Sequence, residues 1–216
     1  MQEAKHHESK TSFQLERFIF FSDGVFAICI TLLVMEIKVP ALPEPTDRAL
    51  LQYLSSTSLK FFGFLLSFYI IGHYWIVHHR IFGYVKKSTG MLLWLNLAFL
   101  LTVVLLPFSS GLFGEYGSNI NMDLPYLIYV LNMCLTGLVN CWLWVYVSHP
   151  KRDLLTHTIS KERIHLGIIR SLAIPFIFIL SLIVSLFSPI ISRIILILIP
   201  LVSNYDFKKL ENKANS

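Results

Sequence analysis

The stretch Arg17-Phe-Ile-Phe-Phe-Ser-Asp23 opens the first long apolar segment of the chain, which continues almost unbroken to Ile37. An ionisable group at membrane depth costs at least ~2.5 kcal/mol even on permissive insertion scales, so such groups face protein or water rather than lipid. The segment therefore predicts a membrane-spanning helix in which the Asp23 carboxylate needs polar partners within the protein.

The composition of the whole chain is that of an integral membrane protein. Hydrophobic residues make up 55% of the 216 residues, charged residues make up 14%, and the mean hydropathy is +0.63. Soluble domains contain roughly 25% charged residues, whereas a helix that crosses a bilayer needs about 20 apolar residues. We expect one all-α transmembrane domain over residues 1–216, with six spans near 16–37, 57–79, 91–113, 124–147, 166–187 and 189–203.

The sixth predicted span is the weakest of the set. It is short, it carries Arg193, and only the Ser188-Pro189 turn separates it from the fifth span. Five spans followed by a re-entrant hairpin are therefore the alternative topology.

The positively charged residues alternate between the two sides of this arrangement. Short cytoplasmic loops carry an excess of Lys and Arg. One side holds most of these residues: Lys5, Lys10, Arg17, Arg80, Lys86, Lys87, Lys151, Arg152, Lys161, Arg163, Arg170, Lys208, Lys209 and Lys213. The other side holds only Lys38, Arg48, Lys60 and Arg193. We therefore expect both termini in the cytoplasm, and the net charge of +5 gives no reason to expect nucleic acid as a partner.

A helical wheel of the first span, drawn at about 100° per residue, separates two sectors. One sector is an apolar stripe that consists of Ile28, Thr31, Leu32 and Met35. Stripes of this kind usually contact lipid or the protein core. The other sector holds Asp23, Ala27, Ile30 and Val34. We expect this second sector to pack against the rest of the subunit, because Gly24 beside the carboxylate lets another backbone approach closely.

Spans two and three supply candidate partners for the carboxylate of Asp23. Trp75, His78 and His79 share one face near the cytoplasmic end of span two, because their spacing is i, i+3 and i+4. Asn96 lies at a similar depth in span three. Buried polar groups are hydrogen-bonded, and the expected cluster consists of Ser22, Asp23, Trp75, His78 or His79, and Asn96. The competing interpretation is a proton relay, since Asp and His in membranes also carry protons.

A metal or haem site is a weaker interpretation of the histidines at positions 73, 78 and 79. His78 and His79 are adjacent and point about 100° apart on a helix, and no cysteine or second carboxylate has ligand spacing beside them. A haem held by ligands on facing helices stays open. Nucleotide-binding and hydrolase motifs are absent. We expect no enzyme activity, no metal and no cofactor.

Span four carries a polar stripe, formed by Asn132, Thr136 and Asn140 at i, i+4 and i+8. Such residues usually hydrogen-bond to neighbouring helices. A polar pathway through the subunit is the alternative interpretation.

The first span resembles the first helix of prokaryotic members of the lysosomal potassium channel family, transmembrane protein 175. The residues that carry the resemblance are Arg17-Phe-Ile-Phe-Phe-Ser-Asp-Gly-Val-Phe-Ala-Ile28, Thr31-Leu-Leu, Glu36-Ile-Lys-Val-Pro40, Trp75-x-x-His78-His79-Arg80 and Asn96. These motifs cover roughly the first half of the chain, and the six-span topology matches over the whole length.

The resemblance implies a homotetramer in the plasma membrane of a prokaryote, with span one lining a central pore for potassium ions. In the family, a hydrophobic residue one and a half turns after the Phe-Ser-Asp motif forms the narrowest layer, and that position is Ile28 here. Thr31 would form a hydroxyl layer, and Leu32 and Met35 would form apolar layers further out. The structural motif of the helix would be Arg17, Phe21, Ser22 and Asp23.

The expected function is a modestly potassium-selective cation channel with a hydrophobic constriction. The chain has no TVGYG-like loop whose carbonyl groups could replace the hydration shell of the ion, so the preference for potassium comes from the resemblance alone. The alternatives are a secondary transporter, which would hold its substrate between discontinuous helices, and a proton-conducting membrane protein. A purely structural membrane protein is the third interpretation.

Overall fold

The computed structural model describes the backbone of residues 2–117 and 122–204 and the side chains of residues 13–117 and 122–203. Within this part of the chain the secondary structure is helical and no β-strand forms, which confirms the prediction of an all-α protein. The elements in chain order are α1 (Gln2–Leu32), the 3₁₀ helix η1 (Leu33–Glu36), α2 (Asp47–Ser56), α3 (Ser58–Gly83), α4 (Gly90–Val104), α5 (Leu106–Tyr116), α6 (Leu124–Ser148), the 3₁₀ helix η2 (Pro150–Arg152), α7 (Lys161–Ser185), α8 (Pro189–Ile195) and α9 (Leu198–Asn204).

Five helical segments are long and apolar enough to cross a membrane, and they correspond to the first five predicted spans. These segments are Phe13–Glu36, Ser58–Gly83, Gly90–Tyr116, Leu124–Ser148 and Lys161–Ser185. The sixth predicted span consists of α8 and α9, which have 7 residues each. Residues 189–203 would extend about 22 Å as a continuous helix, less than the ~30 Å of bilayer hydrocarbon. This last segment is therefore shorter than the other five, and it is interrupted between its two helices.

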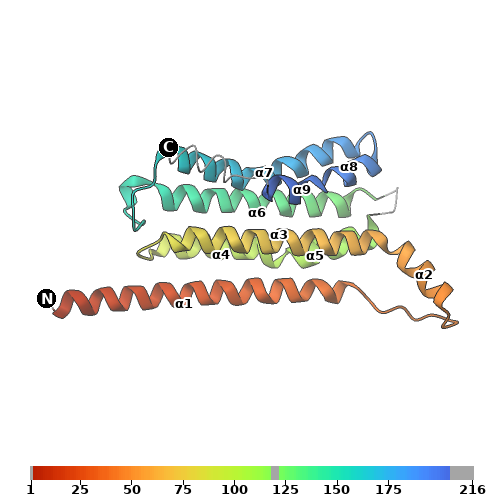
Figure 1. Cartoon of the computed structure of the whole chain (residues 1–216), viewed down its shortest axis with the longest axis horizontal. Helices are drawn as coiled ribbons and strands as arrows, with labels where there is room; N and C mark the ends of the chain where they lie inside the picture. The colour runs from red at the N-terminus through yellow and green to blue at the C-terminus, as the bar shows by residue number, and fades with distance from the viewer. Residues whose placement is uncertain (1, 118–121, 205–216) are drawn as a thin grey trace.

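The long helices run roughly parallel to one another in layers (Figure 1). α1 forms one face of the helical bundle and packs on α3 and α4. α6 packs against α4, α5 and α7, and α7 contacts α8 and α9. α1 and α7 therefore lie on opposite faces of the helical bundle (Figure 1). The start of α1, the α3–α4 loop and the α6–α7 loop all lie at the same end of the layers.

The third span is divided where α4 ends and α5 begins. Pro107 is near the start of α5 and has no backbone N–H. In a continuous helix that missing donor would serve the carbonyl of Val103, so the proline ends the regular hydrogen-bond ladder. Just beyond the break, Ser110 Oγ donates a hydrogen bond to the carbonyl of Gly63 at 3.2 Å. The break therefore does not prevent α5 from bonding to α3.

Hydrogen bonds and close backbone packing join the helices in the interior of the bundle. Ser67 Oγ donates to Ser110 Oγ at 2.8 Å and lies 2.8 Å from Tyr129 Oη, so these bonds join α3, α5 and α6. Helices in lipid gain little from apolar association, which makes such contacts important. α6 and α7 also approach closely at Gly137, where a Cβ atom would overlap Pro175.

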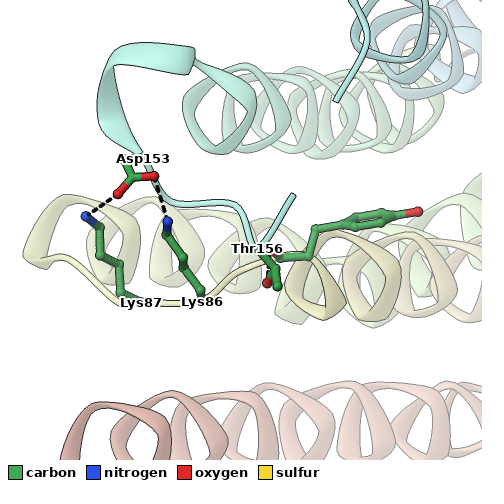
Figure 2. Close-up of polar contacts among 5 residues, drawn as sticks. Lys86, Lys87, Asp153 and Thr156 are labelled. Atoms are coloured by element: carbon green, nitrogen blue, oxygen red, sulfur yellow. Dashed lines mark hydrogen bonds and ion pairs between the residues drawn. The ribbon is translucent and has the colours of Figure 1, made fainter. Parts of the chain in front are cut away.

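Two loops contact each other at the end of the bundle where α3 and α6 end (Figure 2). Val85 and Leu155 form an isolated antiparallel bridge between the α3–α4 loop and the α6–α7 loop. We call the contacts between residues 84–87 and 153–156 the loop clasp.

Side chains reinforce the loop clasp (Figure 2). Lys86 Nζ donates to Asp153 Oδ1 at 2.6 Å, and Lys87 Nζ lies 3.5 Å from Asp153 Oδ2. The backbone N–H of Thr156 donates to the carbonyl of Tyr84 at 2.8 Å, and the Thr156 hydroxyl donates to the same carbonyl at 3.1 Å. The hydrogen bond from Lys86, together with the charges of both lysines, lowers the pKa of Asp153 below its ordinary value.

Candidate functional site

The face of α1 that carries the predicted pore stripe is exposed in the single chain. The relative exposure is 60% for Ile28, 45% for Leu32 and 71% for Met35. Thr31 is also exposed, and its Oγ1 donates to the carbonyl of Ile28 at 2.8 Å. Because the hydroxyl hydrogen is used in this bond, the lone pairs of the oxygen remain available to a cation or to water.

The opposite face of α1 is buried against the rest of the chain. Its buried residues are Leu15, Ser22, Phe26 and Cys29, and buried Leu33 of η1 follows on the same side. In the most apolar window of this span only 22% of the residues are buried, the smallest share among the five long spans. The rest of the chain therefore contacts α1 along one narrow face.

The prediction that the sector of Asp23, Ala27, Ile30 and Val34 packs against the rest of the chain is wrong. Ala27 is exposed, Val34 is 53% exposed and Ile30 is only half-buried. A helix that contacts lipid is largely apolar on every face. A helical wheel therefore groups residues by direction but does not show which group contacts protein. The 3₁₀ turn η1 adds a second deviation, because it advances about 120° per residue instead of 100°. Val34 and Met35 therefore leave the directions that an α-helical wheel assigns to them.

Asp23 is bonded to the neighbouring helix α3. Trp75 Nε1 donates a hydrogen bond to Asp23 Oδ1 across 2.9 Å. Trp75 is 41% exposed and Asp23 is half-buried, so this contact lies at the surface of the subunit. We call Asp23 and Trp75 the surface pair, and it ties α1 to α3 on a side of α1 away from the exposed stripe.

A second contact between α1 and its neighbours is fully buried. Asn96 Nδ2 donates to Ser22 Oγ at 2.9 Å, and Asn96 Oδ1 lies 2.7 Å from His78 Nε2. An amide oxygen only accepts hydrogen bonds, so Nε2 of His78 carries the proton. Ser22 Oγ then donates to the carbonyl of Phe18 at 3.1 Å. We call Ser22, His78 and Asn96 the buried triad, and each of its members has 0% exposure.

The buried triad favours the structural interpretation over a proton relay. The side-chain amide of Asn96 does not titrate in the ordinary pH range, so a proton cannot pass through it from His78 to Ser22. The triad instead joins α3, α4 and α1 by two successive hydrogen bonds, in which His78 donates to Asn96 and Asn96 donates to Ser22.

The remaining residues of the predicted set lie outside both contacts. His79 is exposed, and its ring centroid lies 6.1 Å from that of Trp75. The guanidinium of Arg17 lies over the ring of Phe13 at 5.8 Å, and Phe21 is 54% exposed. The structure therefore separates the single expected cluster into the surface pair and the buried triad, and it brings His79 into neither.

The polar stripe of α6 bonds to the neighbouring helices. Asn132 Nδ2 donates to Ser109 Oγ of α5 at 2.9 Å, and Asn140 Nδ2 donates to Ser171 Oγ of α7 at 3.0 Å. Thr136 Oγ1 donates to the carbonyl of Asn132 at 2.8 Å. All three stripe residues are buried inside the subunit, which favours the packing interpretation.

No contact partner for Glu36 is predicted from the sequence, and the structure shows one. The carboxylate of Glu36 lies against Gly111 of α5, where a Cβ atom would overlap it. Lys60 lines a small pocket together with Glu36 and Gly111. Its ammonium group forms an ion pair with the carboxylate of Glu115 at 2.5 Å. This acidic group sits one residue beyond Met35, at the end of the exposed stripe. Glu36 and Gly111 are too far apart in the sequence for a residue spacing to predict their contact.

The three histidines that suggested a metal site lie in different surroundings. His78 belongs to the buried triad and His79 is exposed. His73 lies with its ring centroid 6.4 Å from that of Tyr69, in a stacked arrangement. Among the described residues, no group of three or more His, Cys, Asp or Glu side chains is placed to hold a metal ion.

Comparison with known proteins identifies relatives of this chain. The family model described as endosomal/lysosomal potassium channel TMEM175 matches residues 17–107, a region that contains the exposed stripe, the surface pair and the buried triad. A potassium channel from Streptomyces collinus is 32% identical over 154 residues, which cover 68% of this chain and 74% of that protein. The human endosomal/lysosomal proton channel TMEM175 is 40% identical over 93 residues, which cover 39% of this chain and 18% of that protein.

A solved structure has the same fold. The crystal structure of a lysosomal potassium-selective channel TMEM175 homolog from Chamaesiphon minutus matches with a TM-score of 0.75 and 26% sequence identity, covering 89% of this chain and 97% of that chain. Since the Streptomyces relative also matches along most of both chains, this protein belongs to the endosomal/lysosomal potassium channel TMEM175 family.

Proposed function

We propose that the chain is one subunit of a potassium-permeable cation channel in which α1 lines the pore. The observation that carries the proposal is the exposed stripe of α1, whose helix is anchored on other sides by the surface pair and the buried triad. A helix fixed in this way presents the stripe at a constant angle. The names of the bacterial relatives, which are potassium channels, support the same function.

Four subunits around a common axis would enclose the pore. In the described part of a single subunit, the polar side chains of α6 are engaged with neighbouring helices and offer an ion no continuous path. An ion that enters a dry apolar medium loses tens of kcal/mol of solvation in the Born picture. Rotational symmetry solves this problem, because four copies of one helix can surround a water-filled path that none contains alone.

The ring of four Ile28 side chains is the proposed constriction. An apolar ring stops ions by dewetting when it is narrow and passes them when it widens. The Thr31 hydroxyls would form the next layer, with Leu32 and Met35 further along. Discrimination between cations would then depend on the width and hydration of these layers rather than on a filter of backbone carbonyls.

The proposed orientation places both termini in the cytoplasm and the protein in the plasma membrane of a prokaryote. The start of α1, the α3–α4 loop and the α6–α7 loop lie at one end of the subunit (Figure 1). Positive charge gathers in the two loops and at the start of α7: Lys86, Lys87, Lys151, Arg152 and Lys161. Short loops with excess Lys and Arg face the cytoplasm. The predicted cytoplasmic lysines at positions 208, 209 and 213 lie outside the described residues.

Reconstitution in liposomes tests the proposal. With potassium inside and sodium outside, a potassium-permeable channel sets up a membrane potential that a voltage-sensitive dye reports, and protein-free liposomes are the control. We expect flux that needs no counter-substrate. Saturable flux that requires a substrate on the opposite side would contradict the channel and support a secondary transporter.

Proton permeation is the second candidate, because the human relative is named a proton channel. The buried triad supplies no relay, so protons would follow the pore water. Liposomes that contain a pH-sensitive dye and no potassium measure this flux. His78→Gln keeps a hydrogen-bond donor beside Asn96, so we expect proton flux to be unchanged in this variant.

A further inference from the structure

The exposed stripe ends at η1, far from the two polar contacts that anchor α1. The anchoring residues Ser22 and Asp23 lie in the first half of the span Phe13–Glu36. Residues 24–32 of α1 and the four residues of η1 extend about 20 Å beyond them. Among the described side chains of residues 24–35, none forms a hydrogen bond or ion pair with another helix. The surface pair and the buried triad therefore do not by themselves fix the far end of the stripe.

The 3₁₀ turn η1 places Glu36 on the same side as Leu33. Side chains three residues apart eclipse one another in a 3₁₀ helix, and Leu33 is buried. η1 packs on α3 and α5, so the side chain of Glu36 is directed toward the bundle. Met35, the preceding residue, is exposed. The geometry of this one turn therefore decides which side chain faces the bundle and which one continues the stripe.

Gly111 of α5 leaves room for the Glu36 carboxylate. A Cβ atom at Gly111 would overlap the carboxylate, and its three nearest neighbours would all be atoms of Glu36. Lys60 of α3 lines the same small pocket, so a positive charge lies near the carboxylate. We call the contact between Glu36 and Gly111 the outer seat.

We propose that Glu36 is a positioning residue for the last layer of the pore. The outer seat holds η1 against α5 and thereby directs Met35 toward the proposed axis, so that four Met35 side chains form a layer of constant width. This inference rests on the proposed function, because it assigns Glu36 to the pore that α1 would line. Glu36 acts here through the geometry of the turn and not through contact with an ion.

Two substitutions remove the outer seat in different ways. Gly111→Ala keeps the carboxylate of Glu36 but displaces it, and the overlap involves the end of a flexible side chain, so α5 itself can stay in place. Glu36→Ala removes the carboxylate altogether. Effects of residues in contact are not additive. The double variant should therefore behave like Glu36→Ala alone.

Two matched variants control for the added methyl group and for the lost charge. Gly72→Ala adds a methyl group to α3 where a Cβ atom meets nothing within 4 Å. Glu44→Gln removes one exposed negative charge from the segment between η1 and α2. Both should behave like the parent protein in the measurements below.

Amide hydrogen exchange in the purified full-length protein measures the turn without any ion flux. The Ile37 N–H donates to the carbonyl of Val34 at 3.0 Å, just after the end of η1. Without the outer seat the turn opens more often. We therefore expect exchange of the Ile37 amide to be about tenfold faster in both single variants and in the double variant, as for the loss of one well-placed contact. Exchange of the Phe26 amide, in the regular part of α1, should be unchanged.

The ratio of potassium to sodium permeability measures the effect on the pore. Reversal potentials in planar bilayers give this ratio. We expect a lower ratio in Gly111→Ala and Glu36→Ala, with no further decrease in the double variant, because Met35 would no longer hold one direction.

Faster Ile37 exchange together with a lower permeability ratio supports the proposal. Faster exchange with an unchanged ratio overturns it and leaves Glu36 as a structural contact only. A changed ratio with normal exchange also overturns it, because Glu36 would then act through its charge. Unchanged exchange, or an effect of Gly111→Ala that adds to that of Glu36→Ala, rules out the outer seat. A parent protein that passes no potassium contradicts the proposed function itself, and this assignment with it.

Discussion

At the scale of single residues, Ile28 has a different role from the surface pair and the buried triad, which anchor its helix. Ile28 is 60% exposed and lies in a regular part of α1, with its side chain directed away from buried Phe26 and Cys29. Replacing it changes the proposed pore surface but removes no buried contact within the subunit. Replacing a member of the buried triad removes a buried contact but leaves the proposed pore surface unchanged.

We predict that Ile28→Asn and Ile28→Ala raise the potassium conductance and weaken discrimination against sodium. A polar or smaller side chain hydrates or widens the narrowest layer, so the dewetting barrier falls. Single-channel recording in planar bilayers measures both properties. Ile183→Asn, at a position on α7 that is 52% exposed, is the matched control and should conduct like the parent protein. Unchanged currents in both Ile28 variants, with intact assemblies, would remove Ile28 from the constriction.

We predict that Asn96→Ala destabilises the protein more than Asp23→Ala does. Loss of Asn96 leaves His78 Nε2 and Ser22 Oγ without this partner at fully buried positions, and each buried unsatisfied group costs about 1–3 kcal/mol. Loss of Asp23 affects Trp75, which is 41% exposed and can bond to water. Thermal melting in one detergent gives the ranking.

Asp23→Ala should also leave the ratio of potassium to sodium permeability unchanged, because its carboxylate contacts α3 rather than the exposed stripe. A well-assembled Asp23→Ala protein with an altered ratio would place this carboxylate on the ion path and contradict its anchoring role.

At the scale of elements, two contacts decide how the helices on the far side from α1 are held. α6 and α7 approach closely through glycines, and the loop clasp joins the ends of the α3–α4 and α6–α7 loops. The first contact lies within the membrane layer and depends on shape. The second lies outside it and depends on charge, so the two respond to different perturbations.

Gly137→Ala should destabilise the protein by about 1–3 kcal/mol, the usual cost of overpacking a tight contact. The added methyl group would overlap Pro175 and press on the Ser171 carbonyl, so α6 and α7 must separate. Gly72→Ala is the control, since a Cβ atom there meets nothing within 4 Å in the subunit. In a helix interior this control should be neutral or slightly stabilising. Equal melting temperatures for the two variants would contradict the close packing.

The loop clasp should loosen as pH falls. The pKa of Asp153 is lowered in the folded protein by its hydrogen bond to Lys86 and by the charges of Lys86 and Lys87. Its contribution is therefore complete above the ordinary aspartate pKa of about 4 and is lost as pH falls through the lowered folded value. Exchange of the Thr156 amide hydrogen, corrected for its intrinsic pH dependence, reports the opening.

Asp153→Asn supplies the control for this pH dependence. Asparagine tolerates the left-handed backbone at this position, where φ is 48°, but it cannot ionise. We expect faster Thr156 exchange in this variant with no further change between neutral and acidic pH. An acid-dependent opening that persists in Asp153→Asn would assign the effect to another group.

At the scale of the whole molecule, the central prediction is that cysteines placed at Leu32 or Met35 cross-link neighbouring or diagonal subunits. The native cysteines at positions 29, 134 and 141 must first be replaced. Cross-linking should produce dimers on a denaturing gel and reduce the current, because it ties the pore helices together. A cysteine at Ile183 on α7, on the opposite face from α1 (Figure 1), is the control and should give far less of these products. Monomeric Leu32 and Met35 variants that still conduct would place the pore elsewhere.

The sequence could predict contacts that follow from spacing within one helix, and it could not predict those that depend on how helices face one another. The shared face of Trp75 and His78 and the depth of Asn96 were enough to anticipate their approach to Ser22 and Asp23. The packing face of α1 was missed because lipid and protein favour the same apolar side chains. The contact between Glu36 and Gly111 was also missed, since it depends on the relative positions of η1 and α5.

The narrow buried face of α1 has a consequence for how the protein responds to dilution. In the proposed tetramer, other subunits would cover most of the surface of α1, because its own subunit buries only 22% of the residues in its most apolar window. The free energy that positions this helix would then depend on protein concentration, as it does for any structure completed by association. On dilution in detergent, α1 should lose protection from proteolysis before α6 and α7 do, so the proposed pore helix would be the first to unfold when dilution separates the proposed subunits.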